Sequence, residues 1–267
     1  MSLHRFYLLP FLVLILIRSS GFSEVLFQGG GVYDINYRIN DSVSIDRNTP
    51  LAQTHVTLNS GGWVDKEVYC LGSSQFTLNG GHVEGYLNFW KNSTGEINGG
   101  SVKSRVYIGD ESSVVINHVT IGDLTLVWNN SNAVINGGSF GFTPSIGYQQ
   151  GILATENAYV TINGGLIKGL LVGFRDNAAY DMSTIKLAGS NFKMNGMDIS
   201  YGQYYASDFV RDSVGGIGLL TGTLANGDSL NANVYINDGA CLYLIPEPAS
   251  LSLLALGATL TGRRRRK

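Results

Sequence analysis

Three elements at the C-terminus together have the chemistry of a membrane-sorting segment. They are the triplet Pro246-Glu247-Pro248, an apolar run over residues 249–262, and the cations Arg263, Arg264, Arg265, Arg266 and Lys267. The run can enter a bilayer, and by the positive-inside rule the cations stay cytoplasmic, so the preceding chain faces outward. At 14 residues the run is short for a permanent span, which needs about 20. We therefore expect residues 246–267 to be a transient anchor that is removed after export.

Two tryptophans form a second candidate site. Trp90 and Trp128 each follow an apolar position that strand alternation places inside, so both indole rings are expected to point outward. They share one phase of the repeat described below and should lie two coils, or roughly 10 Å, apart. Outward rings on one face can stack sugars. They can also pack under a loop or against neighbouring side chains, which is the interpretation we favour.

Residue types suited to enzyme chemistry are present but do not cluster. Polysaccharide-cleaving enzymes need paired carboxylates or a calcium site built from several acids. The best candidates, Asp110-Glu111 and Asp123, are separated by less than one full repeat and so fall out of register, and solvated turn acids explain them better. His82 and His118 lie at different phases of the repeat and have no Cys or Asp at metal spacing. We therefore predict no catalytic residue, no metal and no cofactor.

A 19-residue repeat determines the elements that position these residues. Its markers are the pairs Gly61-Gly62, Gly80-Gly81, Gly99-Gly100, His118-Val119 and Gly137-Gly138, followed after an insertion by Gly164-Gly165. The last five pairs are preceded by Asn79, Asn98, Asn117, Asn136 and Asn163. Asn and Gly tolerate the left-handed backbone of a tight corner. Stacked Asn amides can also hydrogen-bond to one another in a ladder.

The apolar positions keep the register of this repeat. One column consists of Leu78, Ile97, Ile116, Ile135 and Ile162. Within each unit apolar and polar residues alternate, which indicates half-buried strands and no helix. Such a short unit cannot bury its own apolar face and must stack on copies of itself. We predict an all-β protein, a parallel β-helix (solenoid) with about 19 residues per coil and roughly 7–8 coils, closed by a C-terminal antiparallel cap.

The segment 1–23 is predicted to be a secretory signal peptide. Residues 1–5 carry positive charge, residues 6–17 are an unbroken apolar core, and small residues around Gly21 stand at cleavage spacing.

The solenoid is expected over residues 33–195. Its start is set by matching Ile39 to Leu58, one repeat later. Residues 196–245 are expected to form the cap, with a hairpin that turns at Asn226-Gly227. A cap is needed because the last coil would otherwise present an unpaired edge.

The charge between the two predicted targeting segments is strongly acidic. Seven of the 18 basic residues but only one of the 20 acidic residues lie outside residues 24–245, which therefore carry a net charge near −8. An acidic surface argues against nucleic acid as a partner.

The C-terminal triplet, apolar run and cations resemble the PEP-CTERM signal of exported bacterial proteins, which an exosortase-type transpeptidase processes near the Pro-Glu-Pro. The strand, Asn-Gly-Gly, strand units, followed by Leu-Thr-Gly-Thr-Leu over 220–224 and by this tail, are similar to exported planctomycete-type β-repeat proteins. The resemblance implies the export machinery and an exosortase-type enzyme as partners. It also implies a brief stay in the inner membrane and a final location at the cell surface or outside the cell.

These observations predict a non-enzymatic structural or interaction protein of the cell envelope or extracellular matrix. The alternative is a carbohydrate-binding protein or a polysaccharide lyase or hydrolase, with an extracellular polysaccharide as partner. An enzyme would be expected to show acids together with Arg or Lys along one face of the solenoid.

Overall fold

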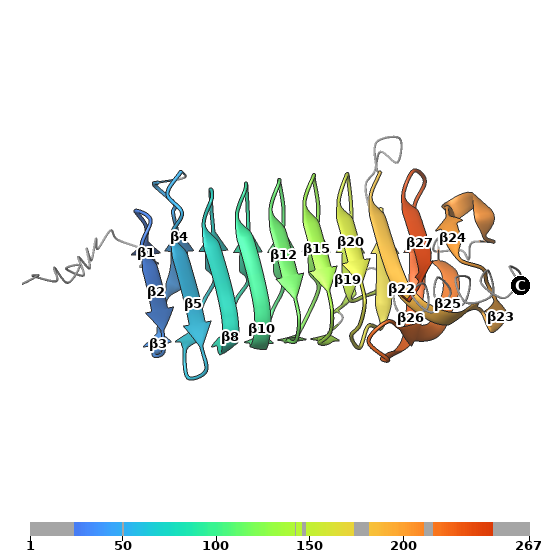
Figure 1. The fold of residues 1–267 in the computed structure, drawn as a ribbon, viewed down its shortest axis with the longest axis horizontal. Coiled ribbons are helices and arrows are strands. Elements are labelled where there is room, and N and C mark those ends of the chain that lie inside the picture. Colours follow the sequence, from blue (N-terminus) through green and yellow to red (C-terminus); the bar gives the residue numbers. More distant parts are fainter. Residues whose placement is uncertain are drawn as a thin grey trace, which may run out of the picture.

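The computed structural model describes residues 24–49, 51–141, 143–145, 148–173, 182–210 and 216–247. These residues form a long β-helix whose strands lie side by side along one axis (Figure 1). The predicted fold class, an all-β parallel solenoid, is confirmed. The expected signal peptide (1–23) and the sorting segment from Pro248 onward lie outside the described residues. Within the described part, no helix has the length and apolar character needed to span a membrane.

The coils contribute strands to three ladders, of which the second ends at β16 (Ser139–Phe140). The first ladder holds the strands before the Asn-Gly-Gly corner: β2 (Val32–Ile35), β5 (His55–Asn59), β8 (Gln75–Val83), β10 (Thr94–Val102), β12 (Ser113–Ile116), β15 (Asn132–Ile135), β20 (Tyr159–Ile162), β22 (Thr184–Met194) and β27 (Cys241–Pro246). The second ladder follows that corner and holds β3 (Arg38–Ile39), β6 (Trp63–Val64), the ends of β8 and β10, β13 (Thr120–Ile121) and β16 (Ser139–Phe140).

The third ladder runs the whole length of the solenoid. It consists of β1 (Glu24–Phe27), β4 (Ser42–Ile45), β7 (Val68–Cys70), β9 (Leu87–Phe89), β11 (Val106–Ile108), β14 (Thr125–Val127), β19 (Ile152–Ala154), β21 (Gly169–Val172) and part of β26 (Ser229–Ile236). All its pairings are parallel, as expected for successive coils.

The core lies inside the coils as columns of equivalent residues. Ile97 pairs in register with Ile116, and Ile116 with Ile135. None of the three side chains exposes any surface to solvent. The predicted internal column is therefore confirmed. Parallel stacking of the coils buries the apolar face that a single repeat would leave exposed.

The asparagines at the Asn-Gly-Gly corner form the expected ladder. The side-chain amide nitrogen of each donates to the amide oxygen of the one before it at 2.7–3.0 Å, through Asn79, Asn98, Asn117, Asn136 and Asn163. The left-handed backbone, however, falls on glycines of this corner, for example Gly80 at φ 101° and Gly138 at φ 117°, and on none of these asparagines. The expectation of left-handed asparagines here is wrong. Their role at the corner is the amide ladder.

A second corner, which the sequence analysis missed, follows the third ladder. Its left-handed positions are Gly72, Lys91, Asp110, Asn129 and Glu156, with φ between 55° and 65°. Fully buried serines follow two residues after four of these positions, at Ser74, Ser93, Ser112 and Ser131. The Ser131 hydroxyl donates to the Trp128 carbonyl at 2.6 Å, so this corner fixes the backbone that carries the tryptophan.

The parallel ladders extend beyond the expected limits at both ends. At the N-terminal end β1 begins at Glu24, and Ile35 rather than Ile39 pairs with Leu58, because the first coil is longer than the repeat. Ile39 instead pairs with Val64 in the second ladder. The sequence pattern matched Ile39 to Leu58 and so assigned Ile39 to the first ladder, whereas it belongs to the next strand, in the second ladder.

The C-terminal cap combines antiparallel and parallel pairing. β25 (Gly216–Leu224) and β26 form the predicted hairpin across Asn226-Gly227, and β25 also pairs antiparallel with β22. β23 (Met197–Asp198) and β24 (Gly202–Tyr204) are antiparallel to β22 and β27. β26 and β27 also rejoin the parallel ladders, so the region expected to be only a cap supplies the last coil. The insertion after Gly138 contains a short antiparallel pair, β17 (Thr143–Ser145) with β18 (Tyr148–Gln150).

Candidate functional site

The two predicted tryptophans lie side by side on the outer side of the third ladder. The ring centroids of Trp90 and Trp128 are 4.9 Å apart, with the rings edge to face at 76°. They lie closer than two coils because the intervening coil has Gly109 at the equivalent position. A Cβ on Gly109 would come within 2.7 Å of the Trp128 indole. The absent side chain therefore allows Trp128 to lean across one coil and contact Trp90.

Three tyrosines extend this pair into a larger aromatic surface. The Tyr107 ring lies 5.7 Å from that of Trp128 and 5.4 Å from that of Tyr86. Tyr69 occupies the same column as Tyr107, two coils earlier, and alternation directs both outward. We call Tyr69, Tyr86, Trp90, Tyr107 and Trp128 the aromatic face.

An ion pair holds the centre of the aromatic face in place. The Arg105 guanidinium donates to the Tyr107 hydroxyl at 3.2 Å and to the Asp123 carboxylate at 2.6 Å. These hydrogen bonds, the one to Asp123 foremost, raise the pKa of Arg105, so the cation is permanent. Asp123, considered above as a possible catalytic acid, thus supports the tyrosine.

A polar cleft of about 380 Å³ borders the tryptophans. It is lined by Lys91, Asn92, Asp110, Glu111, Asn129, Asn130 and Asn157. Asp110 accepts hydrogen bonds from the Lys91 backbone N–H and from the Asn129 side-chain amide, each at 3.1 Å. Asp110 is therefore an acid of a turn, and its hydrogen bonds join three coils. The sequence likewise favours a turn acid over a catalytic acid at this position.

A larger cleft of about 690 Å³ lies on the same outer side, nearer the N-terminal end. We call it the charged cleft, and it is lined by Glu24, Asp41, Ser42, Ser44, Arg47, Lys66, Glu67, Tyr69 and Leu71. Tyr69 belongs to both surfaces. Tyr69 therefore links the cleft to the aromatic face, and Asn88 lies between Tyr69 and Tyr107 in their column.

The charged groups of this cleft are paired across coils. Arg47 contacts Glu24 at 2.6 Å and Lys66 contacts Asp41 at 2.8 Å. The hydrogen bond from Lys66 lowers the pKa of Asp41. Glu67 accepts a hydrogen bond from the Ser42 hydroxyl at 2.9 Å, and burial raises the pKa of Tyr69. At neutral pH the cleft thus presents two ion pairs, whose cations Arg47 and Lys66 are the more exposed partners, and the Glu67 carboxylate beside a neutral phenol.

The charged cleft was not found from the sequence. Its residues come from the first coils, whose lengths differ from the repeat, so the repeat does not align them. This cleft brings acids together with Arg and Lys on one face of the solenoid, which is the feature that we expected of a β-helix enzyme. Among the described residues, no three or more His, Cys, Asp or Glu side chains are placed to hold a metal ion.

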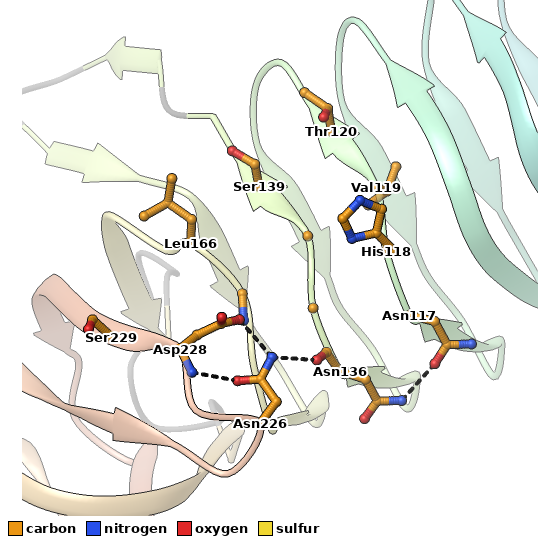
Figure 2. A pocket seen from close by; sticks show the side chains of 13 residues that line it. Asn117, His118, Val119, Thr120, Asn136, Ser139, Leu166, Asn226, Asp228 and Ser229 are labelled. Carbon is orange, nitrogen blue, oxygen red and sulfur yellow. Dashed lines mark hydrogen bonds between the residues drawn. The ribbon is translucent and has the colours of Figure 1, made fainter.

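A third hollow, of about 480 Å³, lies where the cap meets the Asn-Gly-Gly corner (Figure 2). The Asn226 amide donates to the Asn136 carbonyl at 3.1 Å, and Asp228 accepts from the Gly165 N–H at 2.7 Å. The β25–β26 turn is thereby attached to the end of the asparagine ladder. His118 also lines this hollow and is exposed. The polar groups of the turn are engaged in attaching the cap, so we regard the hollow as a structural joint.

Part of the predicted sorting triplet belongs to the folded domain. Pro246 is the last residue of β27 and pairs with Gly189 of β22. One Glu247 carboxylate oxygen accepts a hydrogen bond from the Ser190 hydroxyl at 2.9 Å. Pro248 and the cations Arg263, Arg264, Arg265 and Arg266 lie outside the described residues.

Comparison of the chain with protein-family models, with curated proteins and with solved structures found no match. The fold defines the class, a parallel β-solenoid with a C-terminal cap.

Proposed function

We propose that this chain is an exported, non-enzymatic structural or interaction protein of the cell envelope or extracellular matrix, sorted through Pro246-Glu247-Pro248. The observation that supports the proposal is the position of the folded domain between two segments that the sequence predicts to be targeting signals. Among the described residues, strands extend from Glu24, directly after the predicted signal peptide, to Pro246, the first residue of the triplet. The described residues of this interval form a parallel solenoid with an antiparallel cap, which suits a stiff scaffold displayed outside the cell.

Intact mass of the protein purified from the surface of its native host tests this proposal. The mature chain should begin near Glu24 and end near the triplet, without Arg263 to Lys267. Replacing the triplet by three alanines should leave an uncut, membrane-retained precursor, because the cations orient the segment but give no reason for cleavage. A surface protein that still ends in Lys267 would show that the tail is an ordinary anchor.

The aromatic face supports a second candidate, a carbohydrate-binding protein. Trp90, Trp128 and Tyr107 form a continuous chain of ring contacts, with centroid separations of 4.9 and 5.7 Å. Partly exposed aromatic rings next to carboxylates and amides suit the apolar faces and hydroxyls of sugars. The acids and cations of the charged cleft are also compatible with a polysaccharide lyase or hydrolase. Release of oligosaccharides during incubation with polysaccharide would distinguish an enzyme from a binding protein.

A further inference from the structure

The aromatic face and the charged cleft form one path along the solenoid axis. Both lie on the outer side of the third ladder, and Tyr69 is common to them. The path crosses β4, β7, β9, β11 and β14, which are consecutive rungs of that ladder. Four rung spacings give a length of roughly 20 Å. A surface of this length and direction suits an extended chain rather than a single small molecule.

Aromatic side chains gather on this face more than on the other two. On the first ladder, Tyr159 is 40% exposed and makes no ring contact with another described residue. On the second ladder, Trp63 stacks on His82 at 4.0 Å and is covered by Arg38 at 5.4 Å. Among the described residues, only the third ladder carries a series of contacting rings. The series runs from Tyr86 through Tyr107 to Trp128 and Trp90.

The charges along the path disfavour an acidic ligand. The cations Arg47 and Lys66 are already paired with Glu24 and Asp41. Glu67 accepts a hydrogen bond from a neutral hydroxyl and shares the cation Lys66 with Asp41, so the cleft keeps a net negative charge. The carboxylates outnumber the cations in the cleft, within a domain whose net charge is near −8. Because the net charge is negative, we expect a uronate or sulfated chain to bind this path more weakly than an uncharged chain does.

We propose that the outer side of the third ladder binds an extended polysaccharide free of acidic groups, lying along the solenoid axis from the charged cleft to Trp128. The inference rests on the second proposed function, carbohydrate binding, and specifies its ligand class and its path. The rings stack on the apolar faces of successive sugars, while the carboxylates of the cleft accept hydrogen bonds from their hydroxyl or amino groups.

Calorimetric titration of the full domain with three soluble hexasaccharides tests the proposal. The probes are a neutral glucan, a glucosamine oligomer and a galacturonate oligomer. Binding of the neutral or the amino-sugar chain, with the galacturonate chain at least about tenfold weaker, is expected from the charge of the path. Equal or tighter binding of galacturonate would overturn the ligand class. Failure of all three to bind would reject carbohydrate binding itself, together with this inference.

Variants locate the binding path. Tyr86→Ala removes a ring that is 38% exposed, and Trp128→Ala removes the ring at the far end. Each should weaken binding by about five- to tenfold, the loss expected for one ring contact. Tyr159→Ala, at a tyrosine of similar exposure on the first ladder, is the matched control and should bind like the parent. Unchanged affinity in both Tyr86→Ala and Trp128→Ala, with melting temperatures showing intact folding, would overturn the path.

Discussion

Gly164 leaves the space that the Asn226 side chain occupies where the cap meets the solenoid. A Cβ at this position would occupy the space of the Asn226 side-chain amide. That amide donates to Asn136, and the Asn226 backbone N–H donates to the Asn163 carbonyl at 2.9 Å. The hairpin residue Asn226 therefore has two roles, since it makes the turn and also closes the corner of the solenoid (Figure 2).

We expect Gly164→Ala to destabilise the protein by about 1–3 kcal/mol, because the methyl group must displace the turn. Gly99→Ala is the matched control, since Gly99 is the first glycine of an equivalent pair and a Cβ there meets nothing closer than 3.6 Å. Urea unfolding of both variants measures the difference. Equal midpoints for the two variants would mean that the turn shifts without cost.

At the scale of single elements, each strand of the first ladder is stabilised by the rungs above and below it. β12 pairs with β10 on one side and β15 on the other, and its inward residues Val114 and Ile116 are at most 1% exposed. A charge on the inward side of such a strand has no partner and no water. The same charge on the outward side meets solvent.

Ile116→Asp should therefore unfold the central coils, at a cost of about 3–5 kcal/mol, because it buries an unpaired carboxylate between Ile97 and Ile135. Val115→Asp changes the neighbouring, outward-facing residue of the same strand and should cost about 1 kcal/mol or less. Thermal unfolding followed by circular dichroism compares them. An Ile116→Asp protein that melts within a degree or two of the parent would place Ile116 outside the core.

At the scale of the whole molecule, the last coil is completed by residues from the end of the described chain. β27 pairs parallel with β22 and antiparallel with β24, and it buries Leu242 and Leu244 completely. Pro246 ends this strand, which suits a residue that cannot donate a ladder hydrogen bond. A cut that followed Glu247 would leave the coil intact, whereas a cut before Cys241 would remove it.

A chain that ends at Glu247 should thus melt like the parent domain, and a chain that ends at Ala240 should lose several kcal/mol through the exposure of its last apolar rung. Melting temperatures of the two truncated proteins provide the measurement. If the shorter chain were as stable as the longer one, β27 would not be an integral part of the solenoid.

The 19-residue spacing by itself determined the solenoid, the inward column through Ile97, Ile116 and Ile135, and the asparagine ladder. In a parallel stack, equivalent residues of successive repeats must lie above one another, so a local period specifies their contacts. The hairpin at Asn226-Gly227 was also evident, because its turn residues are adjacent in the chain.

Only the tertiary structure decided how the outer surface is assembled. Trp128 reaches Trp90 because Gly109 leaves space between them, and the charged cleft forms because irregular first coils bring Glu24 and Arg47 beside Glu67. β26 and β27 return to the parallel ladders after a long excursion that breaks the repeat. These contacts depend on the direction of side chains and on coils whose length differs from 19 residues. The repeat period carries no information about either.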